Sequence, residues 1–293
     1  MKALAKAVYS RLPLKRQIFE IVRPFGLPQR LYQHLHFSGP FKVNLPDGSF
    51  RMLSHGDQIE NELFWAGFGR AWEKTSLEVW RRLAKAASNG DILDIGANTG
   101  IYALTARAVN PVSPITAFEP VRRVADRTKA NILLNKFDIS VLVKAVSDQT
   151  GSAIIHDSNG ANVYSASIET AFPGCDTSYE VPTVALDDLC ESRTVSLIKL
   201  DVEMHEPAAI RGMLKMLRRD KPSLLVEVLT AEIGREISEL LEGMDYRFFQ
   251  IDEMAGLIER RSLCPLDGHN WNNLVCSNQQ FEQAELKELC VRA

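Results

Sequence analysis

The first regular pattern in the chain is a pair of segments in which apolar and polar residues alternate. They lie between residues 41 and 52, on either side of Pro46-Asp47-Gly48. Alternation with a period of two is typical of strands, and a turn of this composition between two strands indicates a β-hairpin. Two segments with helical spacing follow at 57–65 and 72–87, where apolar residues recur every three or four positions.

Short apolar runs then alternate with helical segments through most of the remaining chain. The expected strands are 92–95, 115–118, 139–146, 195–202, 222–229, 246–251 and 274–276. The expected helices are 101–109, 121–134, 208–219 and 231–242. Such alternation is typical of an α/β fold in which helices cover a mostly parallel sheet. The pattern therefore predicts a Rossmann-like architecture with an N-terminal extension of helices and a hairpin.

Two segments stand out within this alternation. The helix at 208–219 is well delimited, because Pro207 suits its first turn and Pro222 prevents its continuation. Between residues 152 and 183 the pattern loosens into Gly, Ser, Asn, Pro and Thr, which indicates an inserted set of hairpins or loops. This insertion follows the third strand, at the edge of the sheet where ligands bind in open α/β folds.

Composition narrows the class of protein. The chain has 293 residues, of which 45% are hydrophobic and 24% charged, as in soluble globular proteins. The net charge of −3 gives no reason to expect a nucleic-acid partner. Five widely spaced cysteines without a Cys-x-x-Cys pair suggest neither a disulfide framework nor a zinc site, so we expect a reducing cytoplasm. No apolar run approaches the roughly 20 residues that span a membrane.

The N-terminus is unusually basic. Its first 30 residues carry a single acid, Glu20, and seven basic residues, which are Lys2, Lys6, Arg11, Lys15, Arg16, Arg23 and Arg30. It is either a solvated extension or a surface that contacts an anionic membrane or an acidic partner. We divide the chain into an N-terminal part at 1–88 that covers the site, a cofactor-binding domain at 89–280 and a C-terminal tail at 281–293. The oligomeric state is left open.

A glycine turn after the first strand of the sheet carries the main functional signal. It includes Asp94, Gly96, Asn98 and Gly100, and Glu119 follows nineteen residues after Gly100. In cofactor-binding βαβ units, glycines let the backbone approach the ligand and an acid at the end of the second strand accepts hydrogen bonds from ribose. The rival interpretation of Glu119 is a cap for the next helix.

The spacing of this turn indicates which cofactor it suits. The pattern is Gly-x-x-x-Gly with Asp94 just before it, and the Gly-x-Gly-x-x-Gly pattern of dinucleotide sites is missing. An acid beside the turn repels a pyrophosphate but attracts a cation. S-adenosylmethionine, with its ammonium and sulfonium groups, fits this charge better than a dinucleotide does.

A second group of ionisable residues follows the strand at 195–202. Alternation places Lys199, Asp201 and Glu203 on one face, either as an ion pair with one solvated acid or as part of a reaction site. His205 is then a candidate general base, and its rival interpretation is a surface histidine at a helix start. Glu227 interrupts an apolar strand and must be paired or lie in the pocket. Asp201 and Glu203 alone make a thin case for a metal, so we predict none.

Taken in order, these segments resemble the FkbM-type S-adenosylmethionine-dependent methyltransferases. The matching segments are DIGANTGIYALTA, AFEP, KANILLNKF, KAVSD, VALDDL, LIKLDVEMHEPAAIRGM and KPSLLVEV, which together cover roughly residues 73–229. The resemblance implies a seven-stranded sheet whose last strand is antiparallel. It also implies methylation of hydroxyl oxygens on natural products, sugars, or glycan- or lipid-linked acceptors.

The resemblance also assigns roles by position. Asp94, Gly96, Asn98 and Gly100 would contact the methionine part of the cofactor, Glu119 the ribose, and Ala145, Val146 and Ser147 the adenine edge. Asp201 would lie near the transferable methyl group, and Glu73 would reach over the cofactor. Ala97, Tyr102 and Pro120 complete the predicted cofactor site. The expected catalytic residues are His205 and Asp201, because a neutral hydroxyl needs a base to attack the methyl group.

One residue departs from the family pattern. The family commonly has Asp-Val-Glu-Gly-x-Glu, whereas this chain has Met204 in place of the glycine. A larger residue at that turn is expected to reshape the acceptor pocket.

Two other functions remain as alternatives. A methyltransferase acting on nucleic acid is the nearest, although the Asp/Asn-Pro-Pro-aromatic turn of the enzymes that methylate base amino groups is missing. The other is a non-catalytic cofactor-binding or scaffold protein, because a fold alone does not determine function.

Overall fold

The structure is a computed structural model that describes residues 15–70, 72–87, 90–158, 167–168, 175, 177–267 and 271–291. The helices are α2 (Lys15–Val22), η1 (Arg23–Phe25), α3 (Gln29–Tyr32), α4 (Gln58–Trp65), α5 (Lys74–Ala86), α6 (Ile101–Val109), α7 (Arg122–Asn135), α8 (Leu186–Leu189), α9 (Glu206–Arg211), α10 (Leu214–Asp220), α11 (Ala231–Leu240), α12 (Asn278–Gln283) and η2 (Leu286–Leu289).

The strands form three sheets. They are β1 (Gly39–Leu45), β2 (Gly48–Ser54), β3 (Asp91–Ile95), β4 (Ile115–Phe118), β5 (Ser140–Leu142), β6 (Ala145–Val146), β7 (Gly151–Asp157), β8 (Thr177–Val184), β9 (Val195–Leu200), β10 (Ser223–Glu227), β11 (Arg247–Asp252), β12 (Gly256–Arg260) and β13 (Asn272–Cys276). The main sheet has the order β12-β11-β13-β10-β9-β3-β4-β5, and β13 is antiparallel to both neighbours.

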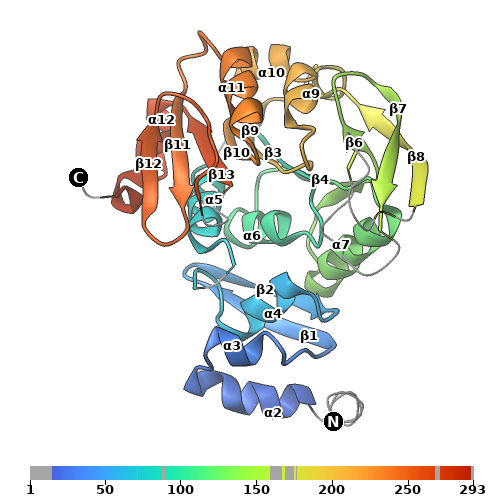
Figure 1. Cartoon of the computed structure of the whole chain (residues 1–293), viewed down its shortest axis with the longest axis vertical. Coiled ribbons are helices and arrows are strands. Elements are labelled where there is room, and N and C mark those ends of the chain that lie inside the picture. Colours follow the sequence, from blue (N-terminus) through green and yellow to red (C-terminus); the bar gives the residue numbers. More distant parts are fainter. Residues whose placement is uncertain are drawn as a thin grey trace.

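The main sheet confirms the predicted Rossmann-like α/β fold. Each of the seven expected strands contributes to it, and of these seven the last, β13, runs antiparallel to its neighbours, as the family resemblance implies. Helices α5 and α6 lie on one side of the sheet and α9, α10 and α11 on the other (Figure 1). The two faces bury separate apolar clusters, with Ile92 and Leu197 in one and Leu93 and Ile198 in the other. Strands covered on both faces explain the continuous apolar runs in the sequence.

Strand boundaries differ from prediction in two places. An eighth strand, β12, extends the sheet at its edge, and its exposed Glu259 and Arg260 hide the apolar signal of a strand. The strand expected at 139–146 is two strands, because β5 pairs with β4 whereas β6 joins β8 in a separate three-stranded sheet with β7. That sheet occupies the insertion expected at 152–183, of which residues 159–166, 169–174 and 176 lie outside the described residues.

The helix predicted at 208–219 is wrong as a single element. Two helices, α9 and α10, meet at Gly212, which packs so closely on the Ser147 backbone that a Cβ atom there would overlap the Ser147 carbonyl oxygen. Helix α10 begins as a separate helix, and the Asp187 carboxylate caps its first turn by accepting hydrogen bonds from the backbone N–H groups of Lys215 at 3.1 Å and Met216 at 2.8 Å. A contact with a distant segment therefore overrides a good local helix pattern.

The N-terminal part forms the predicted hairpin, β1 and β2, with α4 beside it. Side-chain amides on α7 tie the hairpin to the main domain. Asn131 Oδ1 accepts the N–H of Leu53 at 2.8 Å, and Asn135 Oδ1 accepts the N–H of Arg51 at 2.6 Å. Figure 1 shows α2 at the end of the molecule that is remote from the main sheet. Among the helices that the structure describes, none has the length and apolar character to cross a bilayer.

Candidate active site

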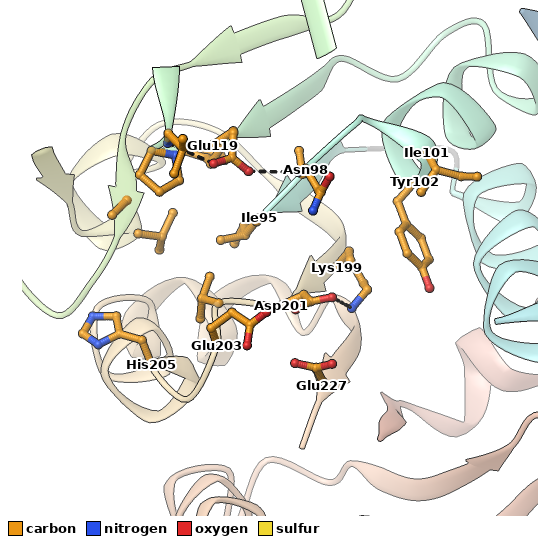
Figure 2. Close-up of a pocket in the computed structure, with 18 of the residues that line it drawn as sticks. Ile95, Asn98, Ile101, Tyr102, Glu119, Lys199, Asp201, Glu203, His205 and Glu227 are labelled. Carbon is orange, nitrogen blue, oxygen red and sulfur yellow. Dashed lines mark hydrogen bonds and ion pairs between the residues drawn. The ribbon is translucent and has the colours of Figure 1, made fainter. Parts of the chain in front are cut away.

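A cavity of about 490 Å³ opens at the carboxyl ends of β3, β4, β9 and β10. Ligands bind at this edge in open α/β sheets, because the loops that follow neighbouring parallel strands meet there. Figure 2 shows Asp201, Glu203 and Glu227 grouped on one side of the pocket and Glu119 with Asn98 on the other. Apolar side chains from Ile95, Phe118 and Val146 complete the wall between these groups.

The glycine turn is built as predicted, but its glycines have a different immediate role. Gly96 and Gly100 have φ values of +78° and +84°, in the left-handed region that favours glycine. A Cβ atom on Gly96 would overlap the carbonyl oxygen of Asp201, and one on Gly100 would approach the Thr128 methyl group to 2.8 Å. Both glycines therefore permit close packing between parts of the protein.

Two carboxyl groups hold this turn in place. Asp94 Oδ2 accepts the N–H of Ala103 at 2.8 Å, and Glu119 accepts the N–H groups of Asn98 at 3.0 Å and Val121 at 2.9 Å. Both residues are almost fully buried. Burial raises the pKa of each to about 7, although the hydrogen bonds to backbone N–H groups act in the opposite direction. Val121 is the residue just before α7, so this bond joins the turn to the start of that helix.

Lys199 is a buried cation surrounded by acids. Its ammonium group lies 3.2 Å from both Asp201 Oδ2 and Asn272 Oδ1, and 5.1 Å from the centre of the Tyr102 ring. Burial lowers the pKa of Lys199, but Asp201, Glu73 and Glu227 outweigh it and the net shift is upward. Of the two alternatives given for these residues, the ion pair is present with Asp201 as its partner, while the other acid, Glu203, lines the cavity.

Two further carboxyl groups face this cation. Glu227 lines the pocket, and its buried Oε2 has no hydrogen-bond partner among the described residues. Burial, followed by the nearby Asp201 charge, holds the pKa of Glu227 well above its usual range. Glu73 accepts the hydroxyl hydrogen of Tyr102, and burial raises the pKa of Glu73 to about 7. Acids therefore outnumber the cations that could neutralise them in this half of the pocket.

The turn after β9 carries the remaining candidates. Glu203 and Met204 have φ values of +54° and +78°, so the chain turns through the left-handed region without a glycine. Burial raises the pKa of Glu203 to about 8, reinforced by Asp201 and Glu206. Met204 is 39% exposed, and its side chain is not part of the cavity lining among the described residues.

His205 is a pocket residue. It lies at the start of α9, lines the cavity and is 7% exposed, so the surface-histidine interpretation is wrong. Its Nε2 atom lies 3.0 Å from the hydroxyl of Ser147. This contact joins the turn after β9 to the segment after β6. The described residues contain no group of three or more His, Cys, Asp or Glu that could hold a metal ion.

Most of the predicted site residues meet in this one cavity. Those that line it are Glu73, Gly96, Ala97, Asn98, Tyr102, Glu119, Pro120, Ala145, Val146, Asp201 and His205. Asp94, Gly100 and Ser147 lie behind its wall and position other groups. Sequence reasoning assigned no role to Lys144, the first residue of the recognised segment KAVSD, or to Trp271, which lies outside the recognised segments, yet both line the cavity. Only the position of Lys144 next to Ala145 could have indicated it.

Comparison with known proteins places these residues in a family. A model described as the methyltransferase FkbM domain matches residues 94–248, which is more than half of the chain. No curated protein matches the sequence. Among solved structures, methyltransferase FkbM from Methylobacillus flagellatus KT is 16% identical with a TM-score of 0.41, and the match covers 64% of this chain and 43% of that one.

Two other solved structures show similar levels of likeness. The SAM-dependent methyltransferase from Agrobacterium tumefaciens is 12% identical with a TM-score of 0.44, and the match covers 82% of this chain and 71% of that one. The tRNA (uracil-54, C5)-methyltransferase from Pyrococcus abyssi, in complex with S-adenosyl-L-homocysteine, is 13% identical with a TM-score of 0.40, covering 81% and 43%. The match to the domain model, on a chain with the expected sheet and glycine turn, shows that this protein belongs to the FkbM methyltransferase family.

Proposed function

We propose that the protein is an S-adenosylmethionine-dependent methyltransferase that methylates a hydroxyl oxygen of a small natural product, a sugar, or a glycan- or lipid-linked acceptor. The observation that carries the proposal is the excess of carboxyl groups in the cavity. Glu73, Glu119, Asp201, Glu203 and Glu227 line it, against the ammonium groups of Lys144 and Lys199. Such a site attracts a cationic ligand and disfavours a pyrophosphate.

The residues present fit this cofactor. Glu227 offers a buried oxygen atom without a hydrogen-bond partner among the described residues, which an ammonium group can fill. Each Glu119 oxygen accepts one backbone N–H and keeps a second lone pair for a ribose hydroxyl. Phe118, Val146 and Ile155 supply an apolar wall for the adenine ring. When bound, S-adenosylmethionine supplies a methyl group on a sulfonium centre.

Two residues are candidates for taking the proton from the acceptor hydroxyl. The imidazole of His205 reaches the cavity, and its contact with Ser147 fixes the ring orientation. Asp201 also faces the cavity, but its carboxylate is already paired with the Lys199 ammonium group at 3.2 Å. His205 is therefore the first candidate. Positioning of the hydroxyl against the methyl group contributes the larger part of the rate advantage.

The test measures methyl transfer from labelled S-adenosylmethionine to a panel of sugars, phenols, lipid-linked glycans and RNA. We expect transfer to a hydroxylated acceptor and none to RNA, because the acidic cavity disfavours a phosphate backbone. Binding of the cofactor without transfer to any acceptor would favour the scaffold alternative. Transfer to RNA alone would replace the proposal with the nucleic-acid alternative.

The role of the base is tested separately. We expect His205→Asn to lower kcat by about a hundredfold while the cofactor affinity stays near that of the parent protein. The matched control is His34→Asn, an exposed histidine outside the cavity. Parent-level kcat in both His205→Asn and Asp201→Asn would show that neither residue is the base.

A further inference from the structure

The N-terminal helices expose a group of large apolar side chains. Ile18 is 48% exposed, Ile21 69%, Phe25 83% and Leu31 51%. We call residues 15–31, which carry them, the α2–α3 surface. Contiguous exposed apolar residues on a soluble domain mark a surface that another molecule covers. The α2–α3 surface has no part in the cavity at the sheet edge.

The apolar side chains of α2 point outward because the helix is held from its other side. Ile18, Ile21 and Phe25 are three and four residues apart, which places them along one stripe of the helix and its continuation η1. Phe19 faces the opposite way and is buried, with its ring centre 5.0 Å from that of Trp65 on α4. The stripe is therefore a fixed feature of the surface.

The charge of this surface identifies its partner. Residues 15–31 contain Lys15, Arg16, Arg23 and Arg30 against Glu20 alone, in a chain whose net charge is −3. Arg16 Nε pairs with Glu20 at 2.9 Å, and four basic residues against one acid leave the segment with an excess of positive charge. In sequence, residues 1–14 add three basic residues and no acid. A positive potential around an apolar stripe opposes self-association, because two copies would bring like charges together.

We propose that the α2–α3 surface binds a lipid bilayer that contains anionic lipid, with the apolar stripe inserted among the acyl chains and the basic residues at the headgroups. Amphipathic segments with bulky apolar residues and an excess of Lys and Arg bind membranes in this way. The attraction per basic residue is small, so binding is reversible and depends on salt. The proposal does not rest on the identity of the methyl acceptor.

Helix α4 connects this surface to the cavity. Trp65 at one end of α4 packs on Phe19, whereas Gln58 and Ile59 at the other end line the cavity. A bilayer bound at the α2–α3 surface would therefore lie one short helix away from the site. The cavity wall nearest the membrane would be the one formed by α4.

The experiment is flotation of the full chain with vesicles. We expect the protein to float with vesicles that mix phosphatidylcholine and phosphatidylglycerol, and to remain in solution with phosphatidylcholine alone. Salt at about 1 M, which shortens the Debye length to roughly 3 Å, should release it. Ile21→Ser combined with Phe25→Ser should weaken binding by about tenfold or more, because these side chains supply most of the inserted apolar area.

Matched control variants distinguish binding through the α2–α3 surface from non-specific binding through other exposed residues. Val112→Ser combined with Met254→Ser removes two equally exposed apolar side chains elsewhere, and should bind like the parent. Arg30→Glu should weaken binding by about tenfold, and Arg261→Glu should not. Binding of S-adenosylmethionine in solution checks that each variant is folded.

Three results would overturn the proposal. One is the absence of flotation with the anionic vesicles. Another is equal flotation with both kinds of vesicle, which would remove the role of charge. The third is a dimer, seen by light scattering, that the Ile21→Ser and Phe25→Ser pair dissolves, because the surface would then be covered by a second copy.

Discussion

Two neighbouring turns border the cavity, and they are built in different ways. The turn after β3 passes through the left-handed region at Gly96 and Gly100, where glycine has no steric cost, and at Asn98, a residue type that enters this region more readily than most. The turn after β9 passes through the same region at Glu203 and Met204, where side chains make it unfavourable. Both turns lie beside carboxyl groups whose pKa values burial raises, but the turn after β9 has no glycine in the left-handed region.

The difference shows how the site divides its tasks. Strands β3 and β9 are parallel neighbours, and the N–H of Asp201 donates to the carbonyl of Ile95 at 3.1 Å. Gly96 has to be a glycine because the Asp201 backbone fills the space of its Cβ. The turn after β3 therefore sets the position of the turn after β9, which carries the candidate catalytic residues. Strain at a turn with reactive groups is common in active sites.

The largest expected effect comes from filling the contact between the two turns. We expect Gly96→Ala to reduce the free energy of unfolding by roughly 4 kcal/mol, from overlap with Asp201 together with the left-handed backbone. Gly69→Ala is the matched control, since Gly69 has φ of +71° with no atom within 4 Å of an added Cβ. It should cost only about 1 kcal/mol. Equal losses in urea unfolding would show that the turns are not in close contact.

Replacing the buried cation, Lys199, tests the charges assigned to the acids around the turn after β9. We expect Lys199→Met to destabilise the protein by about 3 kcal/mol at pH 8.5, because Asp201 loses its partner among the other acids. The loss should shrink at pH 6, because burial raises the pKa of Glu73 to about 7 and this acid is then mostly protonated. Lys129→Met removes an exposed pair with Asp126 and should change little. A loss independent of pH would contradict the assigned charges.

The raised carboxyl pKa values predict two opposite trends with pH. Asp94 and Glu119 hold protons in the folded protein that the unfolded chain has released, so stability is favoured at low pH and lost as pH rises through about 7. We expect the free energy of unfolding to fall by about 1 kcal/mol for each independent carboxyl between pH 6 and 8.5, seen as a lower melting temperature. Affinity for S-adenosylmethionine should rise over the same range, because a cation binds the ionised acids. Parallel trends would contradict this account.

The smallest expected effect comes from relieving the second turn. We expect Met204→Gly to stabilise the protein by about 0.5 kcal/mol, the relief of left-handed strain less the added freedom of the unfolded chain. Met254→Gly, at an exposed position outside the left-handed region, should destabilise it slightly. Thermal unfolding of both variants measures the difference. A destabilised Met204→Gly chain would mean that the Met204 side chain itself holds the turn.

The sequence predicted those helices and strands whose positions depend on the pattern of apolar residues within the element itself. The apolar runs around Leu93 and Ile198 and the turn at Gly96 are visible in sequence because both faces of those strands are buried. Contacts between distant segments were not predictable. Gly212 breaks a helix because of Ser147, and β6 leaves the main sheet to pair with β8, and neither partner can be identified from spacing.

The candidate site shows the same division. Motif order brought most of the cofactor candidates to one cavity, because the ends of parallel strands share one edge of a sheet. Trp271 reaches the cavity only because β13 pairs with β10, so no local pattern marks it. The sequence also does not show why residue 96 has to be a glycine, because the atom that leaves no room for a side chain is the carbonyl oxygen of Asp201, which is distant in sequence.

The central claim is that this acidic cavity binds S-adenosylmethionine, and calorimetric titration of the full chain tests it most directly. We predict one site per chain with proton release on binding, seen as a heat that depends on the buffer, because a cavity carboxyl such as Glu203, whose pKa burial raises to about 8, ionises opposite the ligand's positive charge. NAD should give no heat, since its pyrophosphate meets carboxyl groups. Binding of NAD in preference to S-adenosylmethionine, or no heat with either, would contradict the account.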